Sequence, residues 1–170
     1  MDERLRNLIE LAIQMEKDGI NFYEGLSIKV PYEPARKMIV SFADDERRHL
    51  KILNDIFSSI TSMDIEKYLA ENLPKEKVKT VFDEVQGNID VVTLQDELSA
   101  LKIAMDMEEK SYKLYDEAFS IETDEALKRL WKRLADEERK HYDIFWNTYD
   151  FISNPEEWML REERGLLDGG

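Results

Sequence analysis

The 170-residue chain contains no cysteine. This absence excludes disulfides, thiolate-bound zinc or iron, iron–sulfur clusters and a cysteine nucleophile within these residues. Histidine is nearly as scarce, because only His49 and His141 occur. Any transition-metal site in the chain must therefore be built mainly from carboxylates, supplemented by these two imidazoles.

Long apolar runs and a basic charge balance are also missing. No uncharged apolar run approaches the roughly 18 residues that a membrane-spanning helix requires, and the segment Met1-Asp2-Glu3 is acidic where a signal peptide would be basic. The formal net charge of -14 disfavours nucleic acid or an anionic membrane as the main partner. We therefore expect a cytoplasmic protein that binds neither nucleic acid nor a membrane.

Only 4 prolines and 6 glycines interrupt the chain. Between them, apolar residues recur at spacings of three and four, which is the period of an α-helix. Four such segments of roughly 25 residues each predict an all-α, antiparallel four-helix bundle. We expect one domain over residues 1–170, made of a helix hairpin over about 3–61, a long crossover over about 62–92, a second hairpin over about 93–150, and a tail over 151–170 with a short C-terminal helix.

On the apolar face of each predicted helix, a few positions are occupied by glutamate or histidine instead of an apolar residue. The first and third helices each have one glutamate there, whereas the second and fourth each have a glutamate followed three residues later by a histidine. Residues three apart in a helix lie on the same face, so each pair is expected to point into the bundle. The six residues are Glu16, Glu46, His49, Glu108, Glu138 and His141.

The six residues belong to an internal repeat. A constant spacing of 92 residues relates each of them to its counterpart in the other half of the chain, and relates Tyr23 to Tyr115. The flanking segments 42–49 and 134–141 align without a gap. The chain is therefore expected to consist of two similar hairpins that face each other around a pseudo-two-fold axis.

Four carboxylates in one core need compensating positive charge. An isolated buried carboxylate is costly, and neighbouring like charges raise the cost further. Two divalent cations would neutralise the four glutamates, and each imidazole would supply a nitrogen ligand. Oxygen-rich ligation without thiolate suits iron or manganese better than copper or structural zinc, although zinc could also occupy such a site. The pattern predicts a dinuclear metal centre.

With these motifs, the sequence resembles the ferritin-like superfamily, and specifically the rubrerythrin-like di-iron proteins. The resemblance covers about residues 3–61 and 93–150 and depends on the paired Glu and Glu-x-x-His motifs. It implies a ferritin-like bundle that holds two iron ions, with manganese or zinc as substitutes. It also implies ligand roles: Glu16 and Glu108 terminal, Glu46 and Glu138 bridging, His49 and His141 each capping one metal. One metal would then contact Glu16, Glu46 and His49, and the other Glu108, Glu138 and His141.

Four further residues are candidates for supporting the ligands. Metal-bound imidazoles usually donate their other N–H to a carboxylate or carbonyl, and Asp45 and Glu137 each precede a bridging glutamate in the sequence. An ordinary solvated acidic face explains these two equally well. Tyr23 and Tyr115 could hydrogen-bond the terminal glutamates, or could simply pack as aromatic core residues.

The resemblance implies a non-haem di-iron oxidoreductase that reacts Fe(II) with hydrogen peroxide or dioxygen, in oxidant or iron detoxification. Rubrerythrins proper carry a cysteine-bound iron, whereas this chain has no cysteine, so a separate electron-transfer protein would have to re-reduce the metals. Many rubrerythrins also have a carboxylate three residues after the third-helix ligand. This chain has Ser111 there, and Gly19 at the counterpart position, which weakens a direct transfer of the peroxide-reduction mechanism.

Two other functions remain open from the sequence. The centre could be the ferroxidase entrance of an iron-storage protein, which would need a cage or an encapsulating shell. Alternatively, the metals could serve a structural module without turnover. Bundles of this type commonly form homodimers, and the long connection over about 62–92 would allow hairpins to swap between chains.

Overall fold

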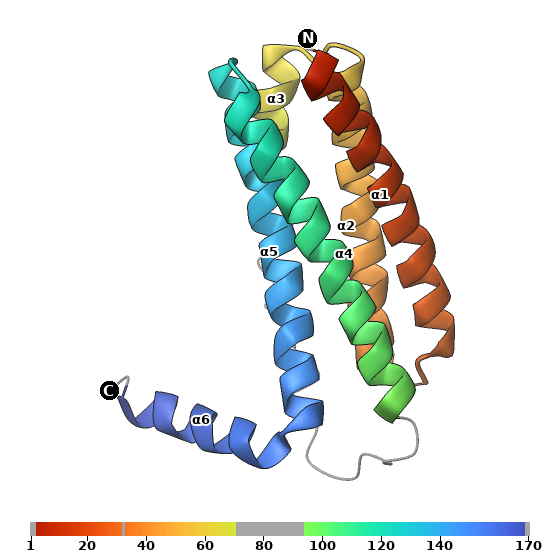
Figure 1. The fold of residues 1–170 in the computed structure, drawn as a ribbon, viewed down its shortest axis with the longest axis vertical. Helices are drawn as coiled ribbons and strands as arrows, with labels where there is room; N and C mark the ends of the chain where they lie inside the picture. Colours follow the sequence, from red (N-terminus) through yellow and green to blue (C-terminus); the bar gives the residue numbers. More distant parts are fainter. Residues whose placement is uncertain (1–2, 32, 71–93, 169–170) are drawn as a thin grey trace.

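The computed structural model describes residues 3–31, 33–70 and 94–168. Within these ranges all regular structure is helical, which confirms the predicted all-α class. The four long helices lie side by side along a common direction (Figure 1). The helices are α1 (Glu3–Lys29), α2 (Glu33–Phe57), α3 (Ser62–Ala70), α4 (Leu94–Ile121), α5 (Glu125–Ser153) and α6 (Pro155–Asp168).

Local sequence explains several helix ends. Pro34 lies in the first turn of α2. Proline is tolerated there because the N–H groups of the first turn have no intrahelical acceptor, so its lack of an N–H costs no hydrogen bond. Asp124 caps α5, since its side chain accepts hydrogen bonds from the backbone N–H groups of Ala126 and Leu127. The backbone N–H of Asn154 closes the other end of α5, and α6 begins at the next residue, a proline.

The helix boundaries differ from the predicted ones at two places. α2 ends at Phe57, short of the predicted hairpin boundary near residue 61, because Ser59 adopts a φ of 71°, in the left-handed region that ends a helix. α5 continues to Ser153, past the predicted end at residue 150. The predicted crossover begins with α3, and its remainder, from residue 71 onward, lies outside the described residues.

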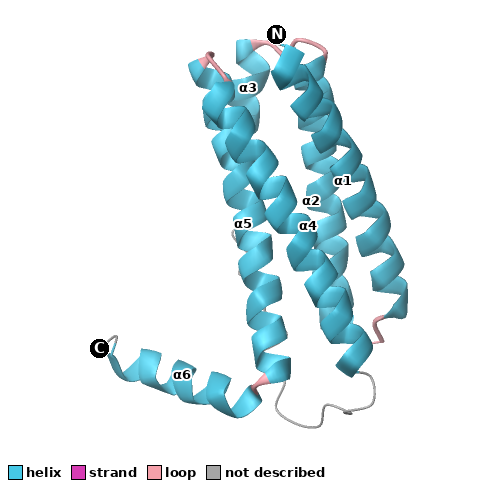
Figure 2. Ribbon diagram, viewed as in Figure 1, coloured by secondary structure: helices cyan, strands magenta, loops and turns pink. Residues whose placement is uncertain are grey.

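The two hairpins pack against each other. α1 packs on α2 and α4 packs on α5, while α1 also contacts α4 and α3 lies against α5. Figure 2 shows the short loops that join α1 to α2 and α4 to α5 at opposite ends of the bundle. α6 contacts the end of α5 and points away from the bundle (Figure 1). None of the described helices has the length and apolarity to cross a membrane.

Apolar side chains fill the bundle on both sides of a polar layer. One apolar cluster, toward α3, includes Leu53, Trp131 and Leu134. The other, toward the opposite end, includes Phe42 and Phe145. Along each long helix, the buried glutamates and histidines lie between these two clusters: Glu16, Glu46, His49, Glu108, Glu137, Glu138 and His141. The hydrophobic stabilisation of the bundle therefore comes from two cores that flank a polar layer.

We expect Leu134→Ala to lower the free energy of unfolding by about 2–5 kcal/mol, because Leu134 is fully buried and its truncation leaves a cavity. Leu11→Ala is the matched control: Leu11 is half-exposed on α1, and the loss should stay below about 1 kcal/mol. Urea unfolding of the metal-free protein, followed by circular dichroism, measures both. Equal losses in the two variants would contradict the assignment of the core.

Candidate metal centre

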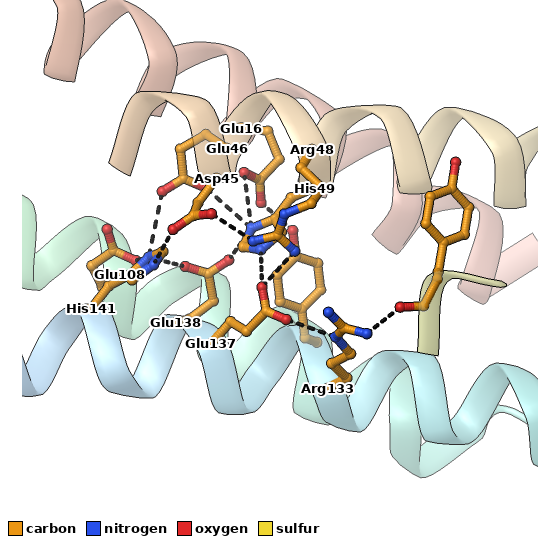
Figure 3. Close-up of polar contacts among 12 residues, drawn as sticks. Glu16, Asp45, Glu46, Arg48, His49, Glu108, Arg133, Glu137, Glu138 and His141 are labelled. Carbon is orange, nitrogen blue, oxygen red and sulfur yellow. Dashed lines mark hydrogen bonds and ion pairs between the residues drawn. The ribbon is translucent and has the colours of Figure 1, made fainter. Parts of the chain in front are cut away.

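Six side chains from the four long helices converge in the polar layer (Figure 3). α1 and α4 contribute one glutamate each, and α2 and α5 contribute a glutamate and a histidine each, one helical turn apart. All six are buried. The structure thus brings together every residue that the sequence motifs single out: Glu16, Glu46, His49, Glu108, Glu138 and His141.

The ligand atoms form two overlapping groups. In each group, one atom per residue lies within 4.8 Å of all the others. The first group is Glu16, Glu46, His49 and Glu138, and the second is Glu46, Glu108, Glu138 and His141. Glu46 and Glu138 belong to both groups, which is the geometry that carboxylates bridging two cations require.

Most of these ligand atoms are buried without a hydrogen-bond partner in the described part of the chain. They are Oε2 of Glu16, both carboxylate oxygens of Glu138, and Nδ1 of His49 and of His141. Buried polar atoms of this kind are costly unless they bind something. Because carboxylate oxygens and imidazole nitrogens face a common point in each group, the side chains fit two divalent cations of the iron or manganese class.

Each imidazole turns its second nitrogen away from the ligand cluster and toward a carboxylate on the other hairpin. Nε2 of His49 lies 2.9 Å from Oε2 of Glu137, and Nε2 of His141 lies 3.2 Å from Oδ2 of Asp45. A carboxylate in this position orients the ring and favours the tautomer whose Nδ1 is free to bind a metal. Asp45 and Glu137 therefore lie where supporting carboxylates are expected, and each serves the histidine of the opposite hairpin.

Two buried tyrosines contact Glu108 and Glu16, again across the hairpins. The Tyr23 hydroxyl donates to Oε1 of Glu108, and the Tyr115 hydroxyl donates to Oε1 of Glu16. Burial and the nearby carboxylates raise the pKa of both tyrosines well above the usual value, so both remain protonated donors. Tyr115 thus binds Oε1 of Glu16, while Oε2 of Glu16 faces the other candidate ligand atoms.

Sequence reasoning missed two arginines that hold the supporting carboxylates. Arg48 Nη2 donates to Oδ1 of Asp45 at 2.7 Å, and Arg48 Nη1 lies 2.8 Å from Oε2 of Glu137. Arg133 Nε donates to Oε1 of Glu137 at 2.9 Å. The sequence does place each arginine three or four residues from a carboxylate on the same helix, Arg48 from Asp45 and Arg133 from Glu137. Such pairs are common on solvated helix faces, so the spacing alone does not indicate a site.

The environment of Glu137 keeps this buried carboxylate ionised. Burial alone would raise its pKa, but the hydrogen bond and the charge of His49, together with the charge of Arg48 and the hydrogen bond from Arg133, lower the pKa to about 2. The same balance acts more weakly on Asp45, whose pKa is lowered by His141 and Arg48 against the effect of burial.

Crowding of the ligands has the opposite effect on two glutamates. Burial, followed by the charges of Glu138 and Glu16, raises the pKa of Glu46 well above its usual value. Burial and the Glu138 charge raise the pKa of Glu108 to about 8. Burial disfavours the charged form of both imidazoles, but the adjoining carboxylates outweigh it and raise their pKa values. The metal-free cluster therefore holds protons that bound cations must displace.

Comparison with known proteins agrees with this geometry. The rubrerythrin family model matches residues 7–149. The chain belongs to the rubrerythrin family. A hypothetical protein from Pyrococcus furiosus has a similar solved structure, with a TM-score of 0.66 and 24% sequence identity over 89% of this chain and 92% of that one. This second likeness shows the fold alone. No curated protein sequence matches the chain.

Membership of the rubrerythrin family confirms the predicted resemblance and the ferritin-like fold. Together with the two overlapping groups of buried ligand atoms, it indicates a protein built to hold a dinuclear metal centre.

We expect the affinity for Mn²⁺ to rise with pH up to about 8, the pKa of Glu108. Protons on Glu46, Glu108 and the two imidazoles compete with the cation, so raising the pH removes the competitor, and binding at lower pH releases protons. Calorimetry in buffers with different enthalpies of ionisation measures the affinity and the number of protons released. An affinity that does not change between about pH 6 and 8 would contradict binding at this cluster.

Glu46→Gln should leave the metal-free protein at least as stable as the original, because a neutral amide imitates the protonated carboxyl that the raised pKa favours. The amide cannot bridge two cations as a carboxylate does, so stabilisation by Mn²⁺ should be largely lost. For comparison, a site at 100 times its Kd stabilises the fold by about 2.7 kcal/mol. Thermal unfolding with and without Mn²⁺ tests this, with Glu10→Gln on the exposed face of α1 as control. Undiminished metal stabilisation in the Glu46 variant would refute the expectation.

Proposed function

We propose that the protein is a non-haem di-iron oxidoreductase that reduces hydrogen peroxide or dioxygen. The observation that carries the proposal is the pair of ligand groups that share Glu46 and Glu138, in a chain that belongs to the rubrerythrin family. In this proposal Glu16 and Glu108 are terminal ligands, and His49 and His141 each cap one metal. When bound, two ferrous ions would supply one electron each, so that hydrogen peroxide and two protons become two molecules of water.

The protein's own contribution is to hold the ligands in a fixed arrangement. The apolar clusters flank the polar layer on both sides, and the hydrogen bonds of Tyr23 and Tyr115 orient the terminal glutamates. Asp45 and Glu137 orient the imidazoles. Ligands that are oriented before the metal binds let the centre change oxidation state with little rearrangement.

The ligand set of this chain differs from the pattern of many family members. Where these carry a further carboxylate, Ser111 is half-buried here, and its counterpart is Gly19. A Cβ at position 19 would lie 3.4 Å from Cγ of Glu46, at ordinary van der Waals distance, so position 19 lies directly beside this shared glutamate. We therefore assign six ligands to the centre and none to these two positions.

We further propose that a separate electron-transfer protein re-reduces the centre. The 170 residues contain no cysteine, so a donor with thiolate-bound iron would lie outside them. A homodimer, with or without exchanged hairpins, stays a prediction.

Anaerobic loading with two equivalents of Fe(II), followed by rapid mixing with hydrogen peroxide or with dioxygen, tests the function. We expect two Fe(II) ions to be consumed per peroxide, faster than free Fe(II) in the same buffer, as measured with a ferrous chelator. Glu138→Gln, which removes a shared ligand, should abolish the acceleration, whereas Glu10→Gln should retain it.

Three outcomes separate the alternatives. Iron-loaded protein that reacts with neither oxidant faster than free Fe(II) would refute the oxidoreductase function. Retention of many ferric ions per chain would favour iron storage. Metal-dependent stability without any turnover would favour a structural role for the metals.

A further inference from the structure

The 92-residue repeat matches the three ligands of each half and the two tyrosines, but not the residues behind the histidines. Glu137 is replaced in the other half by Asp45, and Arg133 by Ser41. The Ser41 hydroxyl donates to the carbonyl of Met38 within its own helix, at 2.7 Å, instead of holding a carboxylate. The two histidines therefore have different support, although their ligand positions match.

The support behind His49 is more buried and has more contacts than the support behind His141. The Glu137 side chain is 3% exposed and both of its oxygens are held: Oε1 by Arg133, and Oε2 by His49 and Arg48. The Asp45 side chain is 29% exposed, its contact with Nε2 of the histidine is longer, and Arg48 is the arginine it contacts. Figure 3 shows Arg133 against Glu137 on the side of the centre that includes His49.

Arg133 also ties this support to a neighbouring element. Its Nη1 donates to the backbone carbonyl of Tyr68 in α3, while its Nε donates to Glu137. α3 packs against α5 near this point, so the guanidinium is held from two directions. The Glu137 carboxylate neutralises the positive charge of Arg133, so Arg133 has little net electrostatic effect on a cation at the centre. Its main effect is to fix the rotamer of Glu137, and Glu137 in turn fixes the ring of His49.

We propose that Arg133 is a positioning residue that makes the two metal positions unequal, so that the position formed by Glu16 and His49 takes up the first divalent cation. This inference rests on the proposed dinuclear centre. A ligand that is already fixed loses less conformational freedom when the metal binds, and outer partners of metal-bound histidines typically change metal affinity by about 10–100-fold. The position capped by His141, which has the more exposed carboxylate behind it, fills second.

Substoichiometric Mn²⁺ tests the proposal in the full chain. With one equivalent, anomalous diffraction from crystals should place most of the manganese beside His49, and electron paramagnetic resonance should show chiefly isolated ions. In Arg133→Ser, which copies the residue of the other half, the first binding step should weaken about ten-fold, and manganese should spread over both positions. Arg133→Lys keeps the charge but not the two-pronged contact, so it should weaken the first step by an intermediate amount.

Arg129→Ser is the matched control. Arg129 lies one turn earlier on α5 and pairs with Glu66 of α3, so its loss also removes a link between the two helices, but that link does not reach the ligands. This variant should retain the preference for the His49 position. Equal occupancy of both positions in the original chain would overturn the proposal while leaving the dinuclear centre intact, as would a tighter first step in Arg133→Ser. Failure to bind Mn²⁺ at all would overturn the centre itself.

Discussion

Four glutamates buried at one level of the bundle are the constraint on which the rest of the structure depends. Each carboxylate taken out of water costs several kcal/mol unless it is paired, and the four raise one another's cost. The helices nonetheless place them together and surround them with two histidines and two tyrosines. A fold selected for stability alone would fill this layer with apolar side chains. The two apolar clusters above and below must therefore stabilise the bundle against its own centre.

The tyrosine and carboxylate contacts made directly to the candidate ligands run from one hairpin to the other. Tyr23 of α1 reaches Glu108 of α4, and Tyr115 of α4 reaches Glu16 of α1. The histidines of α2 and α5 likewise contact carboxylates on each other's helix. Neither hairpin can therefore orient its own ligands, although each carries the complete motif. The arrangement of the candidate ligands therefore depends on how the two hairpins pack against each other.

This crosswise arrangement explains what could be predicted from sequence. The convergence of the six candidate ligands could be predicted because the three-residue spacing and the 92-residue repeat are local, periodic signals. Arg48 was missed because the pairs Arg47–Asp44 and Arg48–Asp45 have the same spacing in the sequence. The second pair is displaced by one residue along α2, so it faces the centre, whereas the first pair is exposed. The early end of α2 depends on the backbone conformation of Ser59, for which the apolar pattern gives no signal.

A repeated motif makes the ligands of the two halves equal, so any functional difference between the halves has to come from the residues around them. In this chain the differences lie there: Arg133 against Ser41 behind the histidines, and Gly19, which lies beside Glu46, against Ser111. Such residues can change the affinity and mobility of a ligand without changing which atoms bind the metal. Substitutions of the residues that contact the ligands can thus make the two metal positions differ although their ligands are the same. The buried, doubly held Glu137 is the point where that asymmetry is strongest.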